Sequence, residues 1–117
     1  MLAFKQKNRI KSKSHFNEIF SYQHKMNTKG FVVYYCKSEQ RQSKYAFVAS
    51  KRVGNAASRN YAKRLMREIV RLNQLRLNCG LDMIFIAKSA IIEYDFLELN
   101  KHFLYLSAQH ELLNQSD

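Results

Sequence analysis

The fold depends on the stretch of residues 81–88, which reads LDMIFIAK. Five consecutive residues in it, 83–87, are apolar, so a strand formed here would be apolar on both faces. A strand with one face in water alternates apolar and polar residues, whereas a strand covered on both faces does not. We therefore expect residues 81–88 to form a central strand of a sheet.

Two earlier stretches have the composition of strands. Residues 31–37 (FVVYYCK), which follow Gly30, and residues 44–50 (KYAFVAS) are rich in β-branched and aromatic side chains. The polar turn between them, residues 38–43, predicts that the two strands pair as a hairpin.

Three amphipathic helices complete the pattern. The first is expected to begin after Ser14, its N-cap, and it places Phe16 and Phe20 on one face. A second, long helix ends near residue 78, and the third follows residues 95–98, which have the form of a capping box. The order αββαβα predicts the α+β class: a single-domain sandwich with helices packed on a small sheet.

The composition is that of a folded basic protein. Of the 117 residues, 46% are hydrophobic and 13% aromatic, which supplies a core and argues against a disordered basic tail. No apolar run follows the basic residues 1–13, so we expect neither a secretory signal nor a membrane span. Cys36 and Cys79 fit no metal-binding spacing, and reduced thiols of this kind are typical of a cytoplasmic protein.

The charge is unevenly distributed along the chain. Its net value is +11, yet residues 1–71 hold 17 basic and 3 acidic residues, whereas residues 72–117 hold 3 basic and 6 acidic ones. Such asymmetry favours one basic surface that meets a polyanion. Nucleic acid is the first candidate. An anionic membrane is an alternative, but the basic stretch lacks the broad apolar face that interfacial helices use.

The long helix separates apolar from basic side chains. One side carries, at helical spacing, the apolar residues Ala62, Leu65, Met66, Ile69 and Val70. The opposite side carries Asn60, Lys63, Arg64, Arg67 and Arg71, with Arg59 at its flank. Residues 51–71 contain seven basic residues and one acidic residue, whereas a face that meets only solvent mixes both signs. We therefore expect bound phosphate here, with a solvated face as the alternative.

The loop before this helix extends the basic surface. Residues 51–55 read KRVGN. Gly54 allows a close backbone approach, and Asn55 can cap the helix. The free N–H groups at the start of the helix also favour an anion.

These residues resemble the signature of the bacterial ribonuclease P protein subunit. Residues 50–56 read SKRVGNA and are followed by Arg59-Asn60, Lys63-Arg64 and Arg67-Glu68. Further matches are Arg9-Ile10-Lys11, Phe16, Phe20 and the strands at residues 31–34 and 84–88. The family's pattern usually has a third basic residue after Arg-Asn, where this chain has Tyr61.

The resemblance implies a ribonucleoprotein endoribonuclease. In this family the RNA subunit is the ribozyme, which uses Mg²⁺ held on RNA to remove the 5′ leader of precursor tRNA. The protein docks on the ribonuclease P RNA and receives the single-stranded leader in a cleft between the sheet and the first helix. The resemblance therefore implies no catalytic side chain, no metal bound by the protein alone and no obligate protein partner. It also implies a left-handed βαβ crossover, against the usual rule.

The resemblance assigns residues to two surfaces of one RNA-binding domain, residues 1–117. The contacts to the RNA subunit would be Lys51, Arg52, Arg59, Asn60, Lys63, Arg64 and Arg67. The leader cleft would involve Phe16, Phe20, Tyr34 and Ser50. A basic arm at residues 1–13 belongs to the domain, whereas the tail at residues 109–117 matches poorly and receives no role.

The residues themselves leave other functions open. No Cys or His pair has zinc spacing, no nucleotide-binding or hydrolase motif is present, and Asp82 is the only acid of the central strand. A ribosomal or other RNA-scaffold protein is the first alternative. A protein-only nuclease and a basic DNA-binding domain follow. Taken without the resemblance, Phe16 and Phe20 have the spacing of ordinary core residues.

Overall fold

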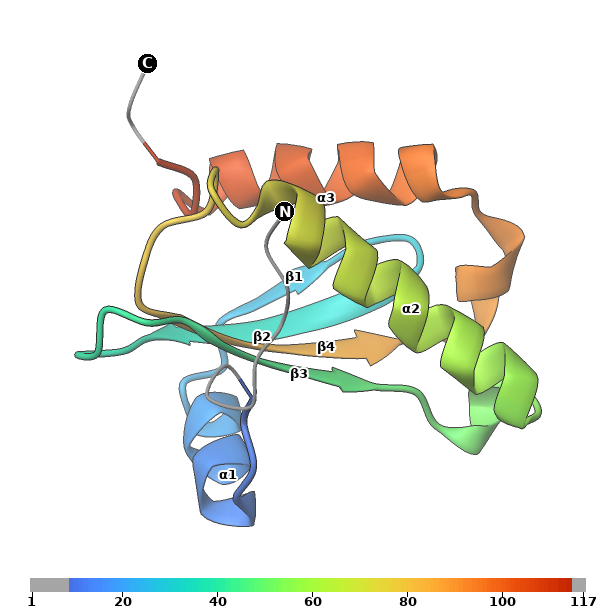
Figure 1. The fold of residues 1–117 in the computed structure, drawn as a ribbon, viewed down its shortest axis with the longest axis horizontal. Helices are drawn as coiled ribbons and strands as arrows, with labels where there is room; N and C mark the ends of the chain where they lie inside the picture. Colours follow the sequence, from blue (N-terminus) through green and yellow to red (C-terminus); the bar gives the residue numbers. More distant parts are fainter. Residues whose placement is uncertain (1–8, 115–117) are drawn as a thin grey trace.

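The computed structural model describes residues 9–114 and places a mixed four-stranded sheet between helices (Figure 1). The elements in chain order are α1 (Lys13–Ser21), β1 (Lys25–Asn27), β2 (Phe31–Lys37), β3 (Lys44–Val48), η2 (Lys51–Val53), α2 (Ala56–Asn73), β4 (Leu81–Ala87), η3 (Ser89–Glu93) and α3 (Phe96–Gln109). The predicted αββαβα order is confirmed. The short strand β1 and the 3₁₀ helices η2 and η3 were not predicted.

The strand β4 lies inside the sheet, as predicted from its apolar run. The strand order is β1-β2-β4-β3, and β4 pairs antiparallel with β2 and parallel with β3. The predicted hairpin of β2 and β3 is therefore wrong, because β4 separates the two strands. Strand propensity alone does not select a partner. β4 occupies the interior position because it is apolar on both faces, and it is buried over most of its length.

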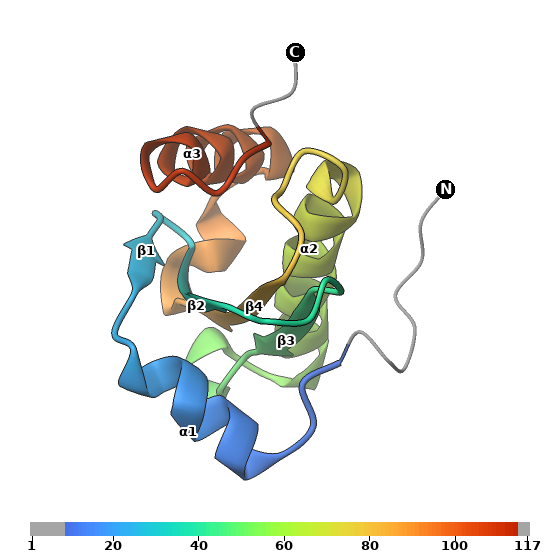
Figure 2. The ribbon, with the colours of Figure 1, turned by 90° about the vertical axis from the view of Figure 1, so that its left-hand side faces the viewer.

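The crossover from β3 through α2 to β4 is left-handed. Figure 2 looks along the strands and shows α2, which connects these two parallel neighbours, above the sheet. Parallel crossovers are almost always right-handed, so the hand is an uncommon feature of the fold. It agrees with the resemblance described above.

The sheet carries a core on each face. Helices α2 and α3 cover one face, where Phe31, Phe85 and Phe103 form part of the larger core. Helix α1 covers part of the other face, where Ile19 packs with Ile84. Alternation along β4 sends Phe85 to the first core and Ile84 to the second.

The helix caps agree with the sequence in two cases and differ in one. Asn55 caps α2 by accepting from the N–H of Ser58, and Asp95 forms the predicted capping box at α3. Helix α1 begins two residues earlier than predicted. Its N-cap is Ser12, whose hydroxyl oxygen accepts from the N–H of His15 at 3.1 Å, and Ser14 lies inside the helix.

Helix α2 ends at Asn73, not near residue 78. The Asn73 side chain donates to the carbonyl of Ile69 at 2.7 Å and also to Asn100 of α3, so the last residue of α2 is tied to the neighbouring helix. Gly80 forms the turn into β4. Its φ of +71° and the carbonyl oxygen of Gln40, 2.7 Å from an added Cβ, both require glycine.

Both ends of the described chain meet the body of the fold. Residues 1–8 of the expected basic arm and 115–117 of the expected tail lie outside the described residues. The N–H of Ile10 donates to the carbonyl of Tyr45 at 3.0 Å, so the arm joins the sheet at β3. Near the other end Leu112 is buried in the larger core. Between residues 9 and 114 no helix is long and apolar enough to cross a membrane.

Candidate nucleic-acid interface

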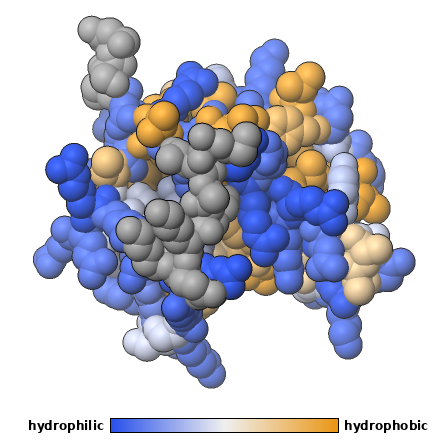
Figure 3. All heavy atoms as spheres, viewed as in Figure 1, coloured by the Kyte–Doolittle hydropathy of each residue, from blue (hydrophilic) through white to orange (hydrophobic). Residues whose placement is uncertain are grey.

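Helix α2 is fixed by its apolar side and presents the opposite side outward. Ala62, Met66, Ile69 and Val70 are fully buried against the sheet and α3. Away from the core, η2 and α2 carry the exposed or half-buried residues that the sequence predicted to contact RNA, which are Lys51, Arg52, Arg59, Asn60, Lys63, Arg64 and Arg67. We call this set the basic face. In Figure 3 the surface over α2 is mostly hydrophilic, and hydrophobic areas lie nearer α3.

Three arginines of this region make contacts within the protein. Arg59 donates to the carbonyl of Gly54 at 3.0 Å, and the guanidinium of Arg67 lies 5.6 Å from the ring centre of Phe47. Arg71 forms a two-point ion pair with Glu68, which lowers the pKa of that carboxyl group. Arg71 is therefore partly neutralised, whereas Arg64 stands exposed.

The segment before α2 is a turn of 3₁₀ helix, where the sequence predicted a loop. The Ser50 hydroxyl caps it by accepting from the N–H of Arg52 at 3.3 Å. Gly54 then takes a φ of +139°, a conformation that side chains rarely adopt. This geometry leaves Lys51 and Arg52 exposed at the start of α2.

The rings predicted for a leader cleft come together beside α1. Phe16 and Phe20, one turn apart on the helix, have ring centres 6.4 Å apart, and Phe20 meets Tyr34 of β2 edge-on at 4.9 Å. All three are half-buried, and the ammonium of Lys25 lies 5.9 Å from the Tyr34 ring centre. We call Phe16, Phe20 and Tyr34 the aromatic cleft. Lys25 belongs to β1, a strand that sequence reasoning missed.

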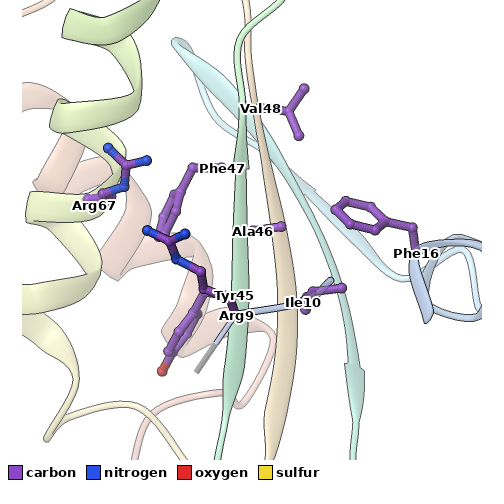
Figure 4. Close-up of a pocket in the computed structure, with 8 residues that line it drawn as sticks. All are labelled: Arg9, Ile10, Phe16, Tyr45, Ala46, Phe47, Val48 and Arg67. Carbon is purple, nitrogen blue, oxygen red and sulfur yellow. The ribbon is translucent and has the colours of Figure 1, made fainter. Parts of the chain in front are cut away.

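A groove of about 230 Å³ follows the outer strand β3. Figure 4 shows Tyr45 and Phe47 on the α2 side of that strand with Arg67, and Ile10 and Phe16 on the α1 side. Arg9 also lines it. Phe47 was not singled out from the sequence. Its position under Arg67 depends on β3 being the edge strand next to α2.

A polar contact lies beneath the aromatic cleft. The Nε2 atom of His15 in α1 and the Oδ2 atom of Asp82 in β4 are 2.8 Å apart. Cys36 is buried nearby. Burial first, and then the charges of Asp82 and Glu18, raise the pKa of its thiol to about 11. Across residues 9–114 no group of three or more His, Cys, Asp or Glu side chains is placed to hold a metal ion.

Similarity to known proteins shows the family of this chain. The family model for ribonuclease P matches residues 4–111, which is nearly the whole chain. The chain belongs to the ribonuclease P protein family. The ribonuclease P protein component of Natranaerobius thermophilus is 30% identical over 107 residues, which are 92% of this chain and 93% of that protein.

Solved structures of ribonuclease P proteins share the fold. The RNase P protein of Staphylococcus aureus has a TM-score of 0.79 and 27% identity, covering 92% of this chain and 98% of that one. The protein from Thermotoga maritima has a TM-score of 0.73 and 27% identity, covering 84% and 93%. The resemblance drawn from the motif is confirmed.

Membership of the ribonuclease P family defines what the chain does. It is the protein component of the ribonucleoprotein endoribonuclease that cleaves tRNA precursors, and its partner is the ribonuclease P RNA. The expectation that the protein acts as part of an RNA-containing nuclease is confirmed at this level.

Proposed function

We propose that two surfaces of this protein bind two different RNAs. The basic face binds the ribonuclease P RNA. The aromatic cleft, together with Ser50, binds the single-stranded 5′ leader of precursor tRNA. The protein thereby holds the substrate on the ribozyme and contributes no catalytic side chain.

The main support for the first assignment is that α2 has one apolar side and one basic side. Its apolar side is fully buried, so the helix cannot rotate to hide its cations. Guanidinium groups on a fixed scaffold suit bidentate contacts with phosphate, and each such contact releases counterions. Glu68 is the one acidic residue of α2, and it is paired with Arg71.

The second assignment is supported by the exposed parts of three aromatic rings. Bases of a single strand stack on aromatic side chains whatever their sequence, which suits leaders that differ between tRNAs. Lys25 beside Tyr34 supplies a cation for the backbone of such a strand. The rings lie on the α1 side of the sheet and α2 on the other, so both RNAs can bind at once.

Two further parts of the proposal concern the metal and the compartment. Mg²⁺ is held by the RNA subunit, where it supplies the chemistry of phosphodiester hydrolysis. The protein works in the cytoplasm. Cys36 and Cys79, both free thiols, are compatible with a reducing compartment.

Reconstitution tests the proposal. Purified protein is mixed with the cognate ribonuclease P RNA and precursor tRNA at low Mg²⁺, and 5′ cleavage is measured. We expect strong stimulation over RNA alone, because the protein's cations offset phosphate repulsion that Mg²⁺ would otherwise screen. An RNA-scaffold protein without turnover would give no stimulation. Cleavage by the protein with no RNA subunit present would contradict the proposal and support a protein-only nuclease.

A further inference from the structure

A second groove lies between α2 and the start of α3. It has a volume of about 330 Å³ and is lined by Tyr61, Arg64, Leu65, Glu68 and Phe96. We call it the Tyr61 groove. Ligand pockets begin near ~300 Å³, so it can hold one flat ring system and little more.

The walls of the groove are aromatic and apolar. Tyr61 is 44% exposed, so much of its ring is accessible. Phe96 is half-buried and packs its inner side on the larger core. Two rings from different helices thus line one groove.

The charges around the groove select its occupant. Arg64 lines it and belongs to the basic face, so the groove opens directly onto the proposed RNA-binding surface. Glu68 is the acid in the lining, and its charge is offset by the ion pair with Arg71. A phosphate can therefore approach Arg64 while a flat apolar group enters beside Tyr61. A carboxylate oxygen of Glu68 can also accept from an exocyclic amino group.

We propose that the Tyr61 groove binds one unpaired nucleobase of the ribonuclease P RNA, stacked on Tyr61, with its phosphate on Arg64. This inference rests on the proposed role of the basic face and adds a contact of another kind. Stacking holds the base, whereas the basic face holds phosphates. Single-stranded and bulged bases are the parts of RNA that proteins recognise in this way.

The test compares Tyr61→Leu with Tyr61→Phe. Leucine keeps an apolar side chain and removes the ring, whereas phenylalanine keeps the ring. We expect Tyr61→Phe to bind the ribonuclease P RNA like the wild type and Tyr61→Leu to bind it roughly 5- to 100-fold more weakly. The dependence of affinity on salt should be unchanged in both, because no charge is removed. Tyr105→Leu, which removes an exposed ring outside the groove, should have no effect.

Chemical probing of the RNA supplies a second readout. Dimethyl sulfate methylates accessible adenine N1 and cytosine N3, and a water-soluble carbodiimide modifies accessible uracil and guanine. With the two reagents, one unpaired base protected by the wild type and by Tyr61→Phe should become reactive with Tyr61→Leu. Equal affinity and equal protection in both variants would overturn the inference. So would self-association of the wild type without RNA that Tyr61→Leu abolishes, because the groove would then be a protein interface. If Arg67→Ala also left RNA affinity unchanged, the proposed role of the whole basic face would fail, which is a distinct result.

Discussion

The Nε2 atom of His15 lies 2.8 Å from the Oδ2 atom of Asp82, and this contact joins α1 to the central strand β4. Asp82 is buried, with a side chain only 8% exposed. Its other oxygen, Oδ1, is buried and has no hydrogen-bond partner within residues 9–114. The His15 contact is thus the main polar compensation for this carboxylate. Because α1 also carries Phe16 and Phe20, the contact helps to fix the aromatic cleft against the sheet.

We predict that His15→Ala lowers the free energy of unfolding by about 1–3 kcal/mol, because it leaves Asp82 buried without a partner. The double variant His15→Ala with Asp82→Ala should lose less than the sum of the two single variants. Urea unfolding of the four proteins measures this coupling. Strictly additive losses would show that the contact contributes nothing to stability.

The basic face is tested by Arg64→Ala and Arg67→Ala. Each should weaken binding to the ribonuclease P RNA and flatten the dependence of affinity on salt by about one phosphate contact. Lys101→Ala on α3 removes the same charge from an exposed site outside the basic face, so it is the matched control. Arg67→Ala also loses its contact with Phe47, so its unfolding must be measured in parallel. Wild-type affinity and slope in both variants would mean that α2 faces only solvent.

Cys36 gives a pH-dependent prediction. Its thiol has a pKa raised from 9.0 to about 11, chiefly by burial, so the folded state favours the protonated form. The resulting stabilisation is complete below pH 9 and is lost as the pH rises toward 11. Urea unfolding of the wild type and of Cys36→Ala across this pH range measures the effect, and the wild type should lose more stability between about pH 9 and 11 than the variant does. Equal losses in the two proteins would contradict this prediction.

The sequence predicts best where local chemistry decides the outcome. The five apolar residues 83–87 are enough to make β4 interior, and the capping box at Asp95 is formed as expected. The part of the basic face that lies on α2 could be drawn from helical spacing, because burial of one side of the helix fixes the other. Even Phe16 and Phe20 meet as predicted, since one helical turn separates them.

Features that depend on tertiary neighbours could not be predicted. The partner of β3 is decided by β4, which comes 33 residues after the end of β3 and displaces the simple hairpin. Near the end of α2, Asn73 contacts Asn100, a residue of another helix. The His15 contact with Asp82 spans 67 positions. In each case, the propensities of the neighbouring residues carry no information about the distant partner.

The last prediction separates the aromatic cleft from the basic face. Phe20 touches both Phe16 and Tyr34, so Phe20→Ala should remove much of the stacking surface. We expect assembly with the ribonuclease P RNA to stay nearly intact, because the basic face is unchanged. Binding of precursor tRNA should weaken by about 1–3 kcal/mol for each base that no longer stacks on an aromatic side chain. Mature tRNA, which has no leader, should bind as before.

The measurement is the ratio of affinities for precursor and mature tRNA in the assembled enzyme. Tyr22→Ala removes a half-exposed ring at the end of α1, outside the cleft, and should leave the ratio unchanged. Because Phe20 is half-buried, unfolding of the variant must also be followed by circular dichroism. A preserved ratio together with a stability loss of ~3–5 kcal/mol would identify Phe20 as an ordinary core residue. In that case the leader must bind elsewhere on the protein.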